Sequence, residues 1–115
     1  MHLDTFRDLC LALPHATEGQ PFGPDVLVFK VGGKMFALLS LDVPAASMKA
    51  DPERAVEQRE RYAGVAPGYH LNKRHWNTVD LQGDVPATVI EALLGDSYRL
   101  VWAGLSRRLR ESLGD

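Results

Sequence analysis

The sequence predicts one small α+β domain: a single antiparallel β-sheet with helices packed on it. The 115 residues suit one domain spanning residues 1–115, and 45% hydrophobic with 24% charged residues is typical of a globular protein. The apolar patterns give the order helix, three strands, helix, two strands, two helices (α-β-β-β-α-β-β-α-α). Runs of adjacent strands favour an antiparallel sheet, because a doubly wound parallel sheet needs strict alternation of strand and helix.

The N-terminal segment from Leu3 to Leu13 predicts an amphipathic helix, since its apolar residues recur on one helical stripe. The following segment, residues 15–25, is rich in glycine and proline and predicts a loop. Val26–Val31 and Met35–Leu41 then have strand composition and flank Gly32-Gly33. Glycines suit the positive φ angles of a tight hairpin turn, so these two strands are expected to pair.

A third short strand is predicted over Ala46–Ala50, followed by a mostly charged surface helix from Pro52 to Tyr62. Asp51 as N-cap and proline at the first helical position mark the start of that helix. Trp76–Leu81 predicts a further strand, bounded by glycine-containing segments.

Two helices are predicted at the C-terminal end. The first opens near Pro86 and is expected to end at Gly95, because glycine is the usual residue after a helix C-terminus. The second is expected to start again from Asp96 or Ser97 and to place its leucines and Val101 at helical spacing.

Charge and cysteine usage limit the function classes. The net charge of −2 and the pI near 6.1 are unusual for a dedicated nucleic-acid-binding domain, so any such activity must rest on a local patch. A single cysteine, Cys10, excludes an internal disulfide and favours a reducing compartment. We find no signal-peptide pattern and no apolar run near the ~20 residues of a membrane span, so we expect a cytoplasmic protein with no membrane partner.

The run from Pro67 to Val79, PGYHLNKRHWNTV, is the unusual feature of the chain. Its aromatic rings offer stacking surfaces and its cations offer phosphate contacts, a combination used to hold nucleic acid. The candidate binding residues are Tyr69, His70, Asn72, Lys73, Arg74, His75, Trp76 and Asn77. If Val79 and Leu81 point into the core, alternation sends Trp76 to the opposite face of the sheet. Trp76 is then partly exposed or covered by another element, and both alternatives stay open.

A second basic cluster lies near the C-terminus, at Arg107, Arg108 and Arg110. Cations in the last turns of a helix complement its dipole, which gives these arginines a structural explanation. They form a second binding patch only if the fold places them beside Lys73 and Arg74.

The motifs of common reaction types are missing, so we predict no enzymatic activity, no catalytic residue and no cofactor. His70 and His75 are five residues apart, which puts them on opposite faces of a strand and is poor for a shared metal. Cys10 lies on the apolar stripe of the first helix and is expected to act as a small hydrophobic residue. Gly32-Gly33 has no phosphate-loop context.

The chain resembles the YjbR/MmcQ family of small bacterial proteins over essentially its whole length. The motifs are DVLVFKVGGKMFALL, MKADPERA, PGYHLNKRHWNTV and GDSYRLVWAGL, of which the third is the most specific. The resemblance implies a fold like that of type III secretion chaperones and DNA binding through a double-wing arrangement. It also implies that the run at residues 69–77 is the common surface, with Arg74 at a more variable position.

Three functions remain open. The first is a non-enzymatic DNA-binding or regulatory protein. The second is a protein- or peptide-binding module that uses the sheet face around Trp76, where a tryptophan beside tyrosine and arginine has the composition of an interface hot spot. The third is a small-ligand site between Tyr69, His70 and Trp76.

Overall fold

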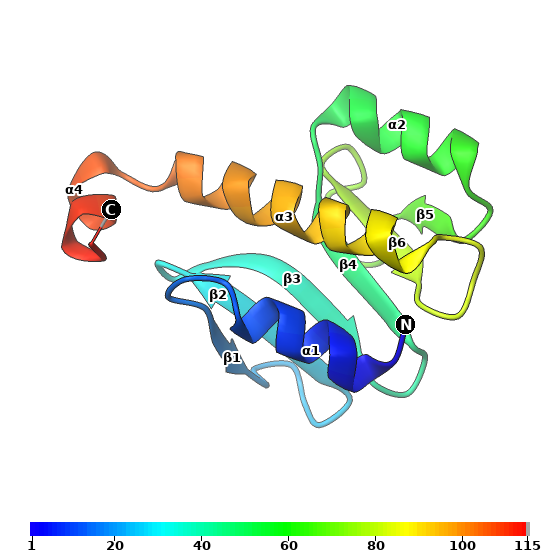
Figure 1. Cartoon of the computed structure of the whole chain (residues 1–115), viewed down its shortest axis with the longest axis horizontal. Coiled ribbons are helices and arrows are strands. Elements are labelled where there is room, and N and C mark those ends of the chain that lie inside the picture. Colours follow the sequence, from blue (N-terminus) through cyan, green and yellow to red (C-terminus); the bar gives the residue numbers. More distant parts are fainter. Residues whose placement is uncertain (115) are drawn as a thin grey trace.

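A computed structural model describes residues 1–114 and contains one six-stranded sheet in the order β1-β2-β3-β4-β6-β5, with every pair antiparallel (Figure 1). The strands are β1 (Thr17–Gly19), β2 (Val26–Val31), β3 (Lys34–Ser40), β4 (Ala45–Lys49), β5 (Val65–Pro67) and β6 (Trp76–Asp80). The helices are α1 (Leu3–Leu11), α2 (Pro52–Arg61), α3 (Ala87–Gly104) and α4 (Arg107–Ser112). The predicted α+β class is confirmed, and the only additional strand among the described residues is β1, which lies in the segment expected to be a loop.

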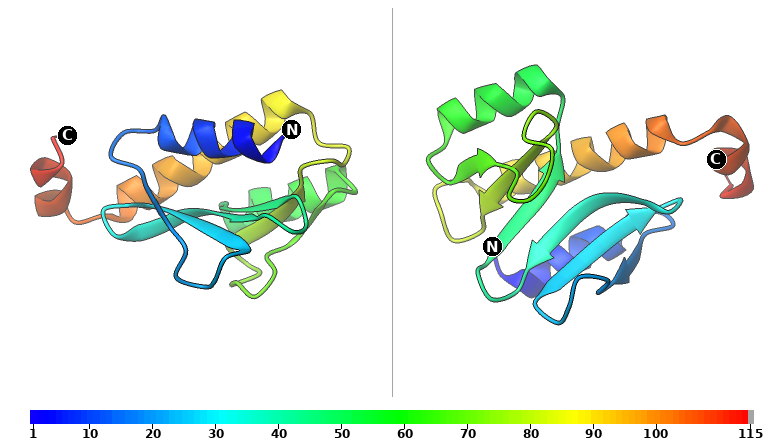
Figure 2. Two further views of the ribbon diagram at one scale, coloured as in Figure 1. Left: turned by 90° about the horizontal axis from the view of Figure 1, so that it is seen from below. Right: turned by 180° about the vertical axis from the view of Figure 1, so that it is seen from behind.

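The helices pack on one face of the sheet. Figure 2 shows α1 and α3 on one side of the strands, while the loops at residues 20–25 and 68–75 project on the other. α2 belongs to the helical side, because the carbonyl of its Ala55 accepts a hydrogen bond from Asn77, which shares a face with its register partner Met48. No helix among residues 1–114 covers the other face, which we call the helix-free face.

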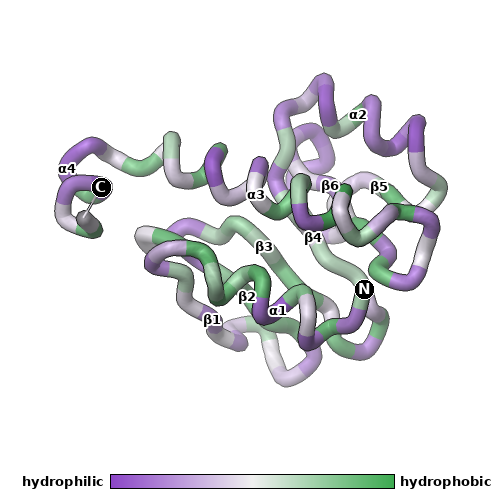
Figure 3. Tube along the Cα trace, in the orientation of Figure 1, coloured by the Kyte–Doolittle hydropathy of each residue, from purple (hydrophilic) through white to green (hydrophobic). Residues whose placement is uncertain are grey.

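Register defines the two faces. Phe29, Ala37 and Met48 are cross-strand partners on the helical face, and all three are buried. Their neighbours Val28, Leu38, Ser47 and Thr78 form a row across the helix-free face. Figure 3 shows apolar residues concentrated in β2 and β3, whereas α2 is mainly hydrophilic. α2 is therefore the surface helix that the sequence predicts.

Cys10 lies inside this core and is fully buried beside Phe6 and Phe29 in one cluster. Burial raises the pKa of its thiol, because a thiolate loses its hydration there. The residue therefore packs as a small hydrophobic side chain, as its place on the helical stripe predicts.

The β2–β3 turn needs both of its glycines. Gly32 and Gly33 have φ angles of 58° and 79°, which confirms the predicted tight hairpin turn. A Cβ at position 32 would also lie 2.7 Å from a methyl group of Leu105. The hairpin tip thus forms the surface against which the end of α3 packs.

The predicted helix break at Gly95 is wrong. α3 runs through this glycine to Gly104, since the residues around it are buried against the sheet. Ser97 in particular donates to the carbonyl of Phe36 at 2.6 Å and accepts the amide of Lys49 at 2.8 Å. These contacts outweigh the helix penalty of one glycine, about 1 kcal/mol. The helix ends instead at Gly104, with Leu105 as its C-cap, and the side chain of Ser106 caps the N-terminus of α4.

The structure also describes no helix, within residues 1–114, that combines the length and the apolar character needed to cross a lipid bilayer.

Candidate functional site

The loop between β5 and β6, residues 68–75, consists of two successive turns. In the first, the amide of Leu71 bonds to the carbonyl of Gly68, and His70 has a φ of 57°. In the second, the amide of His75 bonds to the carbonyl of Asn72, whose side-chain oxygen also accepts the amide of Arg74 at 2.9 Å. The Asn72 side chain therefore shapes the turn, as asparagine commonly does.

Further contacts fix the two turns to each other and to the sheet. Lys73 Nζ donates to the carbonyl of Gly68 at 3.0 Å, and the amide of Gly68 donates to the carbonyl of Trp76 at 2.8 Å. A Cβ at position 68 would lie only 2.8 Å from the Cβ of Trp76. The backbone approaches the tryptophan more closely than any other residue type would allow, so the base of the loop is tightly packed.

Asn77 does not belong to the exposed surface that the sequence suggested. It is 2% exposed and faces α2, because it shares a face with the buried Val79. Its Nδ2 donates to the carbonyl of Ala55 at 3.0 Å, and its Oδ1 accepts from Arg59 at 2.8 Å. The same Arg59 nitrogen lies 3.4 Å from the carbonyl of Lys73. Asn77 and Arg59 thus join α2, β6 and the loop.

Trp76 lies on the helix-free face and is half-buried, which corresponds to the partly exposed alternative of the two that the sequence leaves open. Its register partner in β4 is Lys49. Two positions along, Thr78 Oγ1 lies 2.8 Å from Ser47 Oγ and accepts the amide of Tyr69 at 3.1 Å. The paired hydroxyl groups of Ser47 and Thr78 on the helix-free face therefore hold the start of loop 68–75 in place.

The exposed members of the run lie on the projecting loop. Tyr69 is 72% exposed, and the centroid of its ring lies 4.0 Å from the ring centroid of His70, which is also exposed. The side chains of Lys73 and Arg74 are exposed as well, whereas His75 is half-buried. Two aromatic rings and two cations thus share one loop.

Other cations lie on the same side of the sheet. Lys30 of β2 is exposed and lines a hollow with Val28, a residue of the helix-free face. Lys49 is opposite Trp76 and is half-buried. Acidic groups also occur there, with Asp80 exposed at the far end of β6. The positive charge is therefore greatest toward the loop.

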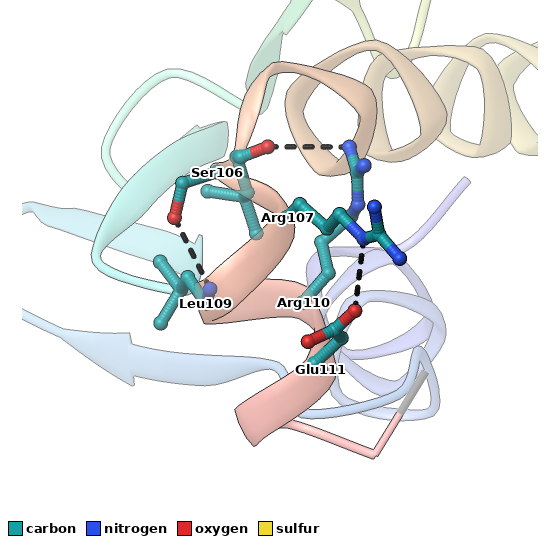
Figure 4. Close-up of polar contacts among 6 residues, drawn as sticks. Ser106, Arg107, Leu109, Arg110 and Glu111 are labelled. Atoms are coloured by element: carbon teal, nitrogen blue, oxygen red, sulfur yellow. Dashed lines mark hydrogen bonds and ion pairs between the residues drawn. The ribbon is translucent and has the colours of Figure 1, made fainter.

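The C-terminal arginines do not join this surface. α4 lies at the opposite end of the molecule's long axis from α2 and β5 (Figure 1). Figure 4 shows Arg107 bonded to Glu111 at 3.0 Å and the Ser106 side chain accepting the amide of Leu109. Arg110 donates to the carbonyls of Ala103 and Leu105, at the end of α3. Arg110 therefore stabilises the junction of α3 and α4, whereas the Arg107 pair lies within α4.

Arg59 is the residue of this site that sequence reasoning missed. It lies in a helix in which most residues are charged, so no pattern distinguishes it from its solvated neighbours. Its partner Asn77 is two positions from Val79, so period-two alternation is the one signal in the sequence that could have placed Asn77 on the buried face.

Side chains of the types that can bind metals or act as nucleophiles have structural explanations in this fold. Within residues 1–114, no three His, Cys, Asp or Glu side chains form a cluster suited to a metal ion. Ser97 is fully buried and both of its hydrogen bonds go to the backbone of the sheet. The arrangement at the loop is one that can bind a partner through stacking and ion pairing.

Comparisons with known proteins agree with this architecture. The YjbR family model matches residues 11–100. The chain is 38% identical to the protein YbdF of Escherichia coli O157:H7, over 91% of this chain and 88% of that protein. It is 34% identical to YjbR of Escherichia coli K12, over 86% of each chain.

Solved structures give the same assignment. The crystal structure of protein DR2400 of Deinococcus radiodurans, with family-model domain DUF419, superposes with a TM-score of 0.90 at 45% identity, covering 97% of this chain and 87% of that one. A crystal structure of a Pseudomonas syringae protein superposes with a TM-score of 0.79 at 30% identity, covering 88% and 99%. The chain therefore belongs to the YjbR family.

Proposed function

We propose that this protein is a non-enzymatic DNA-binding protein and that loop 68–75, with the adjoining helix-free face, is its contact surface. The observation that supports the proposal is the exposure of Lys73, Arg74 and Tyr69 on one loop, beside the half-buried Trp76. In this proposal Lys73 and Arg74 contact phosphate, and the aromatic rings stack or pack against the nucleic acid.

The rigidity of the loop favours binding. Its two turns, the Lys73–Gly68 bond and the Arg59 contact hold the backbone before any partner arrives. A preorganised loop loses less conformational entropy on binding than a flexible one, so more of the contact energy appears as affinity.

The overall charge of −2 limits how strong this binding can be. Phosphate contacts depend on counterion release, and only a few cations lie at the loop. We therefore expect micromolar affinity at low salt, with a shallow dependence on salt that reflects about two phosphate contacts.

The test is fluorescence anisotropy with a labelled short duplex at about 50 mM salt, followed by a salt titration. Arg74→Glu is compared with Arg108→Glu, which makes the same charge change on an exposed arginine of α4. We expect Arg74→Glu to weaken binding about tenfold and to lower the salt slope, because a phosphate contact is lost, and Arg108→Glu to change affinity less than about twofold.

Tyr69→Ala supplies a second variant. We expect it to weaken DNA binding, because stacking on one aromatic ring contributes about 1–3 kcal/mol per base. The 72% exposed side chain is not needed for folding, so the loss is one of binding. No binding by the wild-type protein, or equal losses in the two arginine variants, contradicts the proposal.

A second candidate is a protein- or peptide-binding module on the helix-free face. The half-buried Trp76 in a face that no described helix covers favours it, since tryptophan is common at the centre of interfaces. Sedimentation velocity measures self-association through this face. Concentration-dependent dimerisation that Trp76→Ser abolishes, together with no DNA binding, would select this candidate over the first.

A further inference from the structure

A pocket of about 270 Å³ lies between α2 and α3, on the helical side of the sheet and away from the proposed DNA-contacting loop. Its residues come from the end of β4, the first turns of α2, β6 and the second half of α3. This volume is just below the range of about 300–1,000 Å³ typical of small-molecule sites. The pocket therefore suits a small ligand.

The interior of the pocket is mainly apolar. Met48, Val79 and Leu93 are all at most 8% exposed and lie on its inner wall. Leu100, which is 39% exposed, and Ala103 continue the apolar surface along α3. An apolar body is favoured in such a site, since burying it removes apolar surface from water on both partners.

Polar groups with unused hydrogen-bond donors also line the pocket. The Arg54 guanidinium has no hydrogen-bond or ion-pair partner in the described part of the chain. Arg99 is paired with Asp96 through a single nitrogen, Nη2. Gln58 accepts a long bond of 3.5 Å from Asn77 through Oε1, and its Nε2 donates to no described residue. Donors thus exceed acceptors around the pocket.

The charge of the lining selects the class of ligand. Lys49 also borders the pocket, but it is the register partner of Trp76, so its side chain belongs to the helix-free face. The remaining charged side chains of the lining balance, with Arg54 and Arg99 against Asp51 and Asp96. Because Arg99 already pairs with Asp96, the unpaired Arg54 guanidinium suits one added carboxylate, whereas a di- or trianion would meet repulsion from the two aspartates. Arginine also binds a carboxylate in a bidentate manner, which fixes its orientation.

We propose that the α2–α3 pocket binds a small organic monocarboxylate, with its apolar body against Met48 and Leu93 and its carboxylate at Arg54 and Arg99. This site is independent of the proposed DNA contact, since it involves the other face of the sheet.

The probe is sodium octanoate, titrated into the full ¹⁵N-labelled chain and followed by amide chemical shifts. We expect saturable shifts at residues of the pocket such as Ala50, Leu93 and Ala103. Octanamide has the same apolar chain and no charge, and it is expected to bind about tenfold more weakly, because it cannot form the ion pair.

Three variants locate the site. Arg54→Ala is expected to weaken octanoate binding about fivefold to tenfold and to leave octanamide unchanged, since only the ion pair is lost. Arg108→Ala removes an exposed arginine of α4 and is expected to have no effect. Ala103→Phe places a ring at the exposed end of the pocket and is expected to reduce binding of both probes.

The proposal is overturned if octanoate produces no saturable shift up to about 10 mM, a concentration that would detect even millimolar affinity. It is equally overturned if the shifts lie outside the pocket, or if octanamide binds as tightly as octanoate. Loss of DNA binding in the loop variants has no bearing on these readouts, so the two proposals fail separately.

Discussion

At the scale of single residues, the run from Pro67 to Val79 divides into structural and exposed positions. Gly68, Asn72 and Asn77 have defined roles in the loop and in its attachment to α2. Tyr69 and Arg74 make no side-chain hydrogen bond within residues 1–114 and extend into solvent. A motif of this kind can therefore be characteristic of the fold at some positions and of binding at others.

Asn77→Ala tests the structural assignment. The substitution removes the side-chain donor to the Ala55 carbonyl and the side-chain acceptor of Arg59. We expect a loss of about 2–3 kcal/mol in the free energy of unfolding, measured by urea denaturation. Tyr69→Ala is the control and should change it by less than about 0.5 kcal/mol. Similar stability of the two variants would show that Asn77 is not a structural residue.

Two glycines provide a matched pair. Gly68→Ala would place a Cβ 2.8 Å from that of Trp76, whereas Gly104→Ala, at the end of α3, meets no atom within 4 Å. We expect Gly68→Ala to cost about 1–3 kcal/mol through overpacking and Gly104→Ala to be neutral or stabilising by up to about 1 kcal/mol. Thermal denaturation distinguishes them, and a stable Gly68→Ala variant would disprove the close packing of the loop.

At the scale of elements, α2 is held to the sheet by polar contacts from the helix itself and from the segment just after its C-terminus. Arg59 and Asn77 join it to β6, and Asp84 binds the segment that leads from α2 to β5. The Asp84 carboxylate accepts the amides of Ala63 at 2.9 Å and Gly64 at 2.7 Å. The polar helix α2, with only Ala55 buried, therefore depends on hydrogen bonds for its position.

Asp84→Asn tests this contact through its pH dependence. Hydrogen bonds from backbone amides hold the pKa of the Asp84 carboxyl below its ordinary value, and the bond from Gly64 has the largest effect. Its contribution to stability is therefore present above the unfolded-state pKa, near 3.9, and disappears as the pH falls through the lower folded-state pKa. Asp84→Asn should be less stable than the wild-type protein at pH 7, and the difference should shrink in acid.

Asp25→Asn is the control for that measurement, because the Asp25 carboxylate accepts no hydrogen bond within the described residues. A stability difference for Asp84→Asn that stays constant down to the acid limit of the native state would contradict the assignment.

Sequence patterns predict most elements, and the exceptions have physical reasons. The hairpin at Gly32-Gly33 follows from turn chemistry, which is local. The continuation of α3 through Gly95 depends on contacts of Ser97 with β3 and β4, which are distant in the sequence. β1 has only three residues, all exposed, so no apolar pattern marks it.

The candidate site was predictable in its composition but not in its geometry. Alternation from Val79 correctly places Trp76 opposite the core, yet it gives no measure of how far the loop covers that face. The separation of Arg107 and Arg108 from the loop depends on the length and direction of α3, which no local pattern determines.

At the scale of the whole molecule, the sheet separates two surfaces with different chemistry. The helical side contains the core and the α2–α3 pocket, and the helix-free side presents loop 68–75 and the row of residues beside Trp76 (Figure 2). The division therefore assigns the two proposed ligands to opposite faces.

The most direct test of the proposed DNA contact is to map it on the ¹⁵N-labelled protein with a short duplex at about 50 mM salt. Shifts concentrated at the amides of residues 68–76 and at Thr78, and reversed by added salt, are the predicted result. No shift at protein and duplex concentrations of about 100 μM, or shifts concentrated on α4, would contradict it.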